Sequence, residues 1–147
     1  YGLAAVRLGW AYCPPAVADA LNRVRGPFNV NAIALAAGLA ALDDPAHIET
    51  SRVHNAQWRD WLGQQLGGLG YSIRASEANF IVIDFGDADT ATAADAFMGS
   101  QGVIARGLAA YGMPTALRLT VGTEDGNRAA VRALQAFQAQ PEAGAGS

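Results

Sequence analysis

The second half of the 147-residue sequence alternates short strand-like runs with helical runs, and this order restricts the fold more than any other feature. Two runs rich in β-branched and aromatic residues precede a helical run, and the same succession then repeats. This order predicts a compact α+β unit, of a size that can form its own core. The predicted strands are residues 71–75, 79–85, 103–106 and 117–121, and the predicted helices are residues 91–100 and the stretch after Thr123.

Thr123 is expected to cap the last helix, in which Val131, Leu134 and Phe137 should face the core. Ahead of the α+β unit, residues 45–70 predict one long connecting helix that ends at Gly70. Its apolar stripe recurs at helical spacing and consists of Ile48, Ser51, Asn55, Trp58, Leu62, Leu66 and Leu69.

The first 44 residues predict elements that need burial on several sides. Residues 6–12 read as a buried strand that Cys13, Pro14 and Pro15 stop, and Pro15 can open a helix. Asn29 is a candidate cap for a nearly all-apolar helix over residues 31–42. Because the sequence encodes no further sheet and helices to cover them, we expect these faces to be exposed.

Composition excludes several classes of function. The net charge of −3 without a basic cluster argues against nucleic-acid binding, and the longest apolar run is too short for a membrane span. The lone Cys13 and the absence of a signal-peptide pattern favour a cytoplasmic protein. His47 and His54 are too few for a zinc site, so no metal is expected, and all ten basic residues are arginine.

Known nucleotide-binding and hydrolase motifs are absent, which leaves three arginines in apolar surroundings as candidates for chemistry. They are Arg7, Arg106 and Arg118. Arginine suits bidentate capture of a carboxylate or phosphate. The period of two in residues 117–121 places Arg118 on the face opposite Leu117 and Leu119. From the pattern alone, such an arginine is more often a solvated strand residue or a structural ion-pair partner than a binding residue.

Residues 1–10 (Tyr-Gly-Leu-Ala-Ala-Val-Arg-Leu-Gly-Trp) resemble the stretch after the cofactor-binding lysine in fold type I pyridoxal-phosphate aminotransferases. The family pattern is Ser-Lys-x-(Tyr/Phe)-Gly-Leu-Ala-Gly-Leu-Arg-(Ile/Leu)-Gly, and Ala5 replaces a glycine. Residues 25–31 (Arg-Gly-Pro-Phe-Asn-Val-Asn), 76–80 (Ser-Glu-Ala-Asn-Phe) and 117–124 (Leu-Arg-Leu-Thr-Val-Gly-Thr-Glu) are similar to histidinol-phosphate aminotransferases. The resemblance runs from Tyr1 to about Phe137.

By this resemblance the fold class is α/β, as the carboxy-terminal part of a fold type I enzyme. Residues 1–44 would belong to the large cofactor-binding domain, 45–70 to the connecting helix, 71–138 to the small α+β domain and 139–147 to a disordered tail. The cofactor would be pyridoxal 5'-phosphate, and the complete enzyme would be a homodimer. The lysine is expected two residues before Tyr1, so no catalytic residue is assigned within this chain.

The resemblance also implies roles for the three arginines. Arg7 would hold the cofactor phosphate, Arg118 the α-carboxylate of glutamate or 2-oxoglutarate, and Arg106 would join Arg118 at the phosphate of histidinol phosphate. An aromatic aminotransferase and a threonine-phosphate decarboxylase-like enzyme remain alternatives, since both accept anionic substrates. A non-catalytic fragment or an anion-binding module is the alternative from another class, because lysine is missing.

Overall fold

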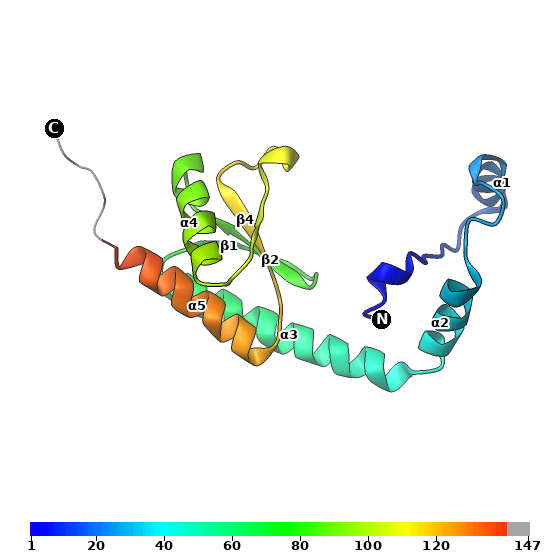
Figure 1. Cartoon of the computed structure of the whole chain (residues 1–147), viewed down its shortest axis with the longest axis horizontal. Helices are drawn as coiled ribbons and strands as arrows, with labels where there is room; N and C mark the ends of the chain where they lie inside the picture. The colour runs from blue at the N-terminus through cyan, green and yellow to red at the C-terminus, as the bar shows by residue number, and fades with distance from the viewer. Residues whose placement is uncertain (141–147) are drawn as a thin grey trace. The chain divides into compact units, whose positions relative to one another are not determined.

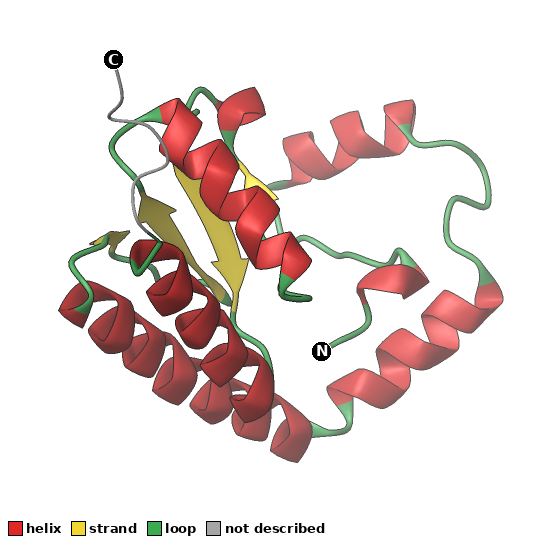
Figure 2. Cartoon of the chain, turned by 60° about the vertical axis from the view of Figure 1, so that its left-hand side comes forward, coloured by secondary structure: helices red, strands yellow, loops and turns green. Residues whose placement is uncertain are grey.

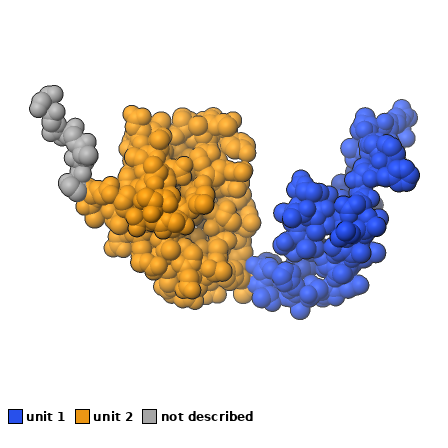
Figure 3. Space-filling model, viewed as in Figure 1, with its two compact units in different colours: residues 1–52 blue, residues 53–147 orange. Residues whose placement is uncertain are grey.

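The computed structural model describes residues 1–140, and the elements form two units, residues 1–52 and residues 53–147 (Figure 3). The division falls inside one long helix, α3 (Pro45–Gly68). Residues 141–147 of the predicted tail lie outside the described part of the chain. None of the helices in residues 1–140 has the length and apolar character needed to cross a membrane.

The first unit contains a short turn of 3-10 helix, two helices and the beginning of α3 (Figure 1). These elements are η1 (Ala4–Val6), α1 (Pro15–Val24) and α2 (Ala32–Leu42). Ala34 is the only buried residue of residues 1–52, all of which are described. Large apolar side chains are exposed instead, as expected from the sequence, and include Trp10 at 76% and Tyr12 at 97%.

The predicted strand over residues 6–12 is wrong. Arg7 ends η1 in the left-handed conformation with φ 57°, and residues 8–12 have no regular structure. A strand needs a neighbouring strand to bond its backbone groups, and residues 1–52 provide none. Burial of residues 31–42 on most sides is likewise not observed within this unit.

The predicted helix cap at Asn29 is also wrong, because Asn31 is the capping residue. The Asn31 side chain accepts a hydrogen bond of 2.8 Å from the Ala34 N–H at the start of α2. The Asn29 side chain instead accepts from Arg25 at 3.3 Å. Asparagine suits a cap at either position, and Asn31 directly precedes the first residue of α2.

The second unit is built on a four-stranded antiparallel sheet in the order β1-β2-β4-β3 (Figure 2). Its strands are β1 (Ser72–Arg74), β2 (Phe80–Asp84), β3 (Arg106–Gly107) and β4 (Ala116–Thr120). The long pairing of β2 with β4 sets Ile81 opposite Leu119 and Ile83 opposite Leu117. One face of the sheet is therefore continuously apolar.

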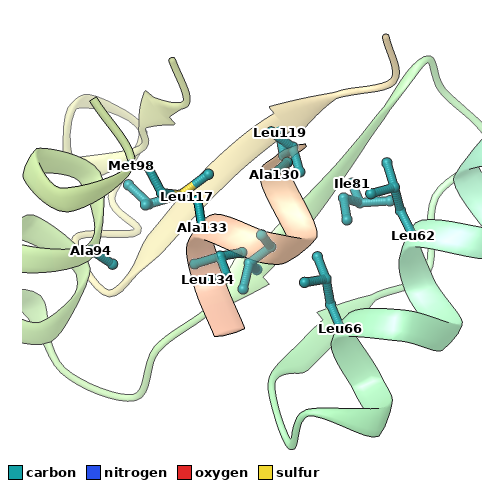
Figure 4. Close-up of a cluster of buried hydrophobic side chains, with 11 residues drawn as sticks. Leu62, Leu66, Ile81, Ala94, Met98, Leu117, Leu119, Ala130, Ala133 and Leu134 are labelled. Atoms are coloured by element: carbon teal, nitrogen blue, oxygen red, sulfur yellow. The ribbon is translucent and has the colours of Figure 1, made fainter. Parts of the chain in front are cut away.

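Three helices supply the side chains that cover this apolar face: α3, α4 (Ala88–Ser100) and α5 (Glu124–Gln138). Figure 4 shows their side chains converging on residues of β2 and β4. The buried cluster consists of Leu62, Leu66, Ile81, Ile83, Ala94, Met98, Leu117, Leu119, Ala130, Ala133 and Leu134. The core predicted from the stripes of α3 and α5 is confirmed at Leu62, Leu66 and Leu134, while Val131 and Phe137 pack at its margin.

The predicted start of α5 is confirmed, whereas the predicted end of α3 is two residues too late. The Thr123 side chain caps α5, as predicted, by accepting from the Gly126 N–H at 3.3 Å. The regular part of α3 ends at Gly68, two residues before the predicted end. Gly70 then takes φ +91° and lets the Tyr71 N–H reach the Leu66 carbonyl at 3.1 Å, a turn that favours glycine.

The predicted strand over residues 103–106 is largely wrong, since only Arg106 and Gly107 pair with β4. The Val103 N–H donates to the Met98 carbonyl at the end of α4, so it is not available to a sheet. Ile104 is 88% exposed. After β3, the turn η2 (Ala109–Tyr111) returns the chain to β4.

Candidate anion-binding site

The sheet face opposite the core carries a row of cationic side chains. Register places Arg74 opposite Val82, Val82 opposite Arg118, and Arg118 opposite Arg106. Because side chains alternate between faces along a strand, these residues share the face that the core helices do not cover. The alternation predicted for Arg118 is confirmed, with Leu117 and Leu119 buried and Arg118 half-buried between them.

Arg106 and Arg118 form a cross-strand pair of like charge. Directly opposed residues on antiparallel strands have Cβ atoms about 5 Å apart, and like charges on such residues destabilise the sheet. Neither guanidinium has a carboxylate within 4.0 Å among residues 1–140. An anion bound between the two arginines would remove this repulsion.

Arg118 also has a buried donor without a partner. Its Nε is the one buried side-chain nitrogen or oxygen in residues 1–140 that makes no hydrogen bond. A buried unpaired donor costs about 1–3 kcal/mol, which native proteins rarely accept without a function. The sequence reading that made Arg118 a structural ion-pair partner therefore has no support within the described residues.

An aromatic ring lies against the Arg118 guanidinium. The Cζ atom of Arg118 sits over the Phe80 ring, 4.9 Å from its centroid. Phe80 is diagonal to Arg118 across the pairing of β2 with β4. Sequence reasoning included Phe80 only as the end of a family-like motif, because a diagonal contact depends on strand register that the motif does not specify.

Arg74, at the edge of the same row, already has an acidic partner. Its Nη2 lies 3.1 Å from Asp84 Oδ2. The Gly86 N–H, the Thr115 side chain and Arg74 together hold the pKa of Asp84 below its ordinary value. Arg74 is therefore a structural ion-pair residue, and the unpaired cations of the row are Arg106 and Arg118 within the described residues.

The segment that precedes β2 and the segment that follows β4 are held by hydrogen bonds at the same end of the sheet. The Val121 N–H donates to the Asn79 carbonyl at 2.9 Å. Asn127, which is buried, accepts from the Gly122 N–H at 2.8 Å and donates to the Gly122 carbonyl at 3.0 Å. His54 Nε2 reaches the same carbonyl at 2.9 Å. These bonds secure the exit of β4.

Helix α3 holds the loop that enters β2. The Asn55 Nδ2 donates to the Ala78 carbonyl at 3.2 Å, and Arg59 lies close to the same oxygen at 3.5 Å. Within the loop, the Ser76 hydroxyl donates to the Phe80 carbonyl at 2.7 Å and accepts from the Ala78 N–H at 3.1 Å. Phe80 and Arg118 are thus both carried by anchored backbone.

Arg7 lies in the first unit. Its side chain is exposed, and Nη1 donates to the Ala4 carbonyl of its own turn at 3.0 Å. One donor therefore fixes the side chain, while the guanidinium keeps further N–H groups for an anion. Its positive φ of 57° is uncommon for a residue other than glycine.

Metal chemistry receives no support from the described residues. No group of three or more His, Cys, Asp or Glu side chains in residues 1–140 could hold a metal ion. The contact between His54 Nε2 and the Gly122 carbonyl was not predicted from the sequence. Trp58 and Trp61 are packing residues and form an edge-on pair with ring centroids 5.1 Å apart.

Comparison with known proteins identifies the family. The sequence model of the aminotransferase class I and II family matches residues 1–134. The chain belongs to this family. Curated relatives include the histidinol-phosphate aminotransferase of Rhodopseudomonas palustris (strain BisB18), which is 46% identical over 143 residues. That match covers 96% of this chain and 39% of the relative. The corresponding enzyme of Maricaulis maris is 50% identical over 139 residues, covering 93% of this chain and 38% of that protein.

A solved aminotransferase structure shares the fold. Histidinol-phosphate aminotransferase from Sinorhizobium meliloti, in complex with pyridoxal-5'-phosphate, matches with a TM-score of 0.82 and 27% sequence identity. The match covers 93% of this chain and 38% of that chain. The predicted fold class, part of a fold type I aminotransferase, is confirmed. The chain spans about two fifths of the length of the relatives that it matches.

Proposed function

We propose that this chain supplies the carboxy-terminal part of a histidinol-phosphate transaminase. The enzyme would convert histidinol phosphate and 2-oxoglutarate to imidazole acetol phosphate and glutamate. The observation that carries the proposal is the unpaired cross-strand pair of Arg106 and Arg118, with its orphaned Arg118 Nε. The names of relatives at 46–50% identity support the choice of substrate.

Each arginine has a distinct task in this proposal. Arg118 binds the α-carboxylate of glutamate or 2-oxoglutarate through in-plane N–H groups. Arg106, which is exposed beside it, joins Arg118 in holding the substrate phosphate. Together the two arginines orient a substrate that carries oxyanions and keep its reacting carbon in a fixed place.

The cofactor of this reaction is pyridoxal phosphate, which supplies the electron sink for transfer of the amino group. The residues present fit its phosphate, because the Arg7 side chain is fixed by Ala4 and retains free donors. These 147 residues contain no lysine, so they do not supply the covalent attachment. The complete protein is proposed to supply this attachment through the lysine of the family pattern.

The large exposed apolar residues of the first unit support two further parts of the proposal. Trp10, Tyr12 and Phe28 are at least 76% exposed, and apolar surface of this kind usually meets another protein surface. We infer that residues 1–44 belong to the large domain, residues 45–70 connect it and residues 71–138 form the small domain. We also infer a cytoplasmic homodimer.

A substrate panel on the complete, pyridoxal-phosphate-loaded enzyme tests the function. The proposal predicts the highest kcat/KM with histidinol phosphate, a large loss with unphosphorylated histidinol, and glutamate as product from 2-oxoglutarate. An aromatic amino acid as the best donor, or release of carbon dioxide from threonine phosphate, would instead identify one of the related activities. Arg106→Ala should reduce the preference for the phosphorylated donor.

A further inference from the structure

We propose that Phe80 is a positioning residue that fixes the plane of the Arg118 guanidinium for carboxylate binding. The inference rests on the proposed function and extends it to a residue that does not itself bind the substrate. Its basis is the placement of the Arg118 Cζ over the Phe80 ring at 4.9 Å. A guanidinium over an aromatic face is attracted by the ring quadrupole, and the attraction grows when water is excluded.

The Phe80 ring beside the guanidinium restricts how the Arg118 head group can turn. A ring that covers one planar face of a guanidinium leaves the N–H groups around its edge available. Nε is buried and has no partner in residues 1–140, so the remaining edge donors of Arg118 are those of its two Nη groups. A carboxylate that approaches in the guanidinium plane can accept from both Nη groups at once. Phe80 therefore favours a planar, bidentate carboxylate at Arg118.

The location of Phe80 separates this role from ordinary core packing. Phe80 pairs with Thr120 and lies on the same sheet face as Arg118, opposite the buried Ile81. It is not a member of the buried cluster or of the apolar residues packed against that cluster. Phe80 is therefore a half-buried aromatic residue on the sheet face that carries the arginines, and its ring contacts the Arg118 guanidinium.

Hydrogen bonds from three segments of the chain hold the backbone around Phe80. The Phe80 carbonyl accepts from the Ser76 hydroxyl, and the preceding Asn79 carbonyl accepts from the Val121 N–H. Asn55 holds the Ala78 carbonyl from α3. The ring is therefore held in place before a ligand arrives, and the Arg118 side chain loses less freedom on binding.

Three variants of the complete, pyridoxal-phosphate-loaded enzyme test the proposal. Phe80→Leu keeps apolar volume and removes the aromatic face, Phe80→Tyr keeps the face, and Phe97→Leu makes the same change in α4. Phe97 contacts Phe137, with ring centroids 5.8 Å apart, and is a matched control for packing. Phe80→Leu should raise the KM for 2-oxoglutarate by about 3- to 30-fold, with kcat changed by less than about twofold.

Phe80→Tyr should restore the KM, and Phe97→Leu should leave it unchanged. An unchanged KM in Phe80→Leu, or an equal rise in Phe97→Leu, would overturn the positioning role. Arg118→Ala separates this outcome from failure of the proposed function. If Arg118→Ala raises the KM but Phe80→Leu does not, only the stacking inference is wrong. If neither variant changes the KM, the carboxylate site itself is wrong, and the positioning role falls with it.

A second readout does not depend on turnover. In the 147-residue chain, the Nε–Hε resonance of Arg118 is observed by ¹⁵N–¹H NMR while 2-oxoglutarate is added. The proposal predicts that this resonance shifts on binding in the unsubstituted chain and in Phe80→Tyr, and that the affinity is about 3- to 30-fold weaker in Phe80→Leu. Equal affinities in the Phe80→Leu and unsubstituted chains would contradict it.

Discussion

Two arginines on one sheet face have opposite surroundings. Arg74 contacts Asp84 at 3.1 Å, whereas Arg118 has a buried Nε without a partner and faces the like charge of Arg106. The first arrangement contributes to the fold, and the second weakens it. A residue that costs stability in the unliganded protein is typical of a binding site.

Replacement of Arg118 by methionine should therefore stabilise the unliganded chain. Arg118→Met keeps a long apolar stem beside Phe80 and removes both the orphaned donor and the repulsion by Arg106. We expect the free energy of unfolding to rise by about 1 kcal/mol, measured by urea denaturation without carboxylate or phosphate. Arg74→Met is the control and should not increase stability, because it breaks an ion pair. A less stable Arg118→Met protein would contradict this account.

The Asn127 side chain should stabilise the backbone at Gly122, just after β4 ends. Asn127→Ala leaves the Gly122 N–H without its acceptor and removes the donor to the Gly122 carbonyl. We expect a loss of about 1–3 kcal/mol in the free energy of unfolding, measured by urea denaturation. Asn22→Ala removes an exposed side-chain contact with Arg25 and should have a much smaller effect. Equal losses in the two variants would show that burial of Asn127 is unimportant.

The sequence allowed Arg106 and Arg118 to be selected as arginines in apolar surroundings, and alternation along the strand placed Arg118 on the face opposite the core. Their direct pairing could not be predicted, since it requires the register of β3 on β4 and the predicted strand extended from residue 103 instead. Asn127 and Phe80 depend on contacts between segments distant in the chain, and no local pattern distinguishes a buried asparagine from a solvated one.

At the level of elements, helices were easier to predict than isolated strands. Helical periodicity and caps depend on neighbouring residues, so α4, α5 and most of α3 were predicted from local signals. A strand depends on a partner, which explains the failure over residues 6–12. The choice of Asn29 over Asn31 as a cap failed for a different reason, since two suitable residues stood two positions apart.

The cap of α4 should make stability depend on pH. Asp87 accepts from the Thr90 hydroxyl at 2.6 Å and from the Thr90 N–H at 2.7 Å, and these hydrogen bonds lower its pKa. Because the folded state has the lower pKa, the stabilisation is present above the ordinary aspartate pKa of about 3.9. It is lost as pH falls through the folded-state pKa.

Asp87→Asn keeps a side-chain oxygen for the cap but cannot titrate in this range. Urea unfolding midpoints measured from neutral to acidic pH should therefore fall less steeply for Asp87→Asn than for the unsubstituted chain. Asp19→Asn, at an exposed ion pair with Arg23 in α1, serves as a control for loss of one carboxylate. Identical pH profiles for Asp87→Asn and the unsubstituted chain would contradict a role of the Asp87 charge at this cap.

At the scale of the molecule, the two units differ in how much they bury. Residues 53–140 contain the sheet and the cluster in which Leu62, Leu66, Ile83, Met98 and Leu134 are fully buried. Residues 1–52 bury only Ala34. Hydrophobic burial is the main favourable term in folding, so the second unit should account for most of the stability of this chain.

Hydrogen exchange of the 147-residue chain tests this difference. Amides of β2, β4 and α5 should exchange slowly and unfold together, whereas amides of α1 and α2 should exchange at rates typical of helices with little tertiary packing. Equal protection of α2 and β4 would show that the first unit is stabilised independently of further protein surface.

The central claim is that Arg118 binds the α-carboxylate of 2-oxoglutarate or glutamate and, together with Arg106, the phosphate of histidinol phosphate. Its most direct test is the steady-state kinetics of Arg118→Ala in the complete, pyridoxal-phosphate-loaded enzyme. The account predicts a higher KM for both histidinol phosphate and 2-oxoglutarate, equivalent to the loss of about 2–3 kcal/mol for a charge-assisted bidentate pair. Kinetic constants equal to those of the unsubstituted enzyme would contradict it.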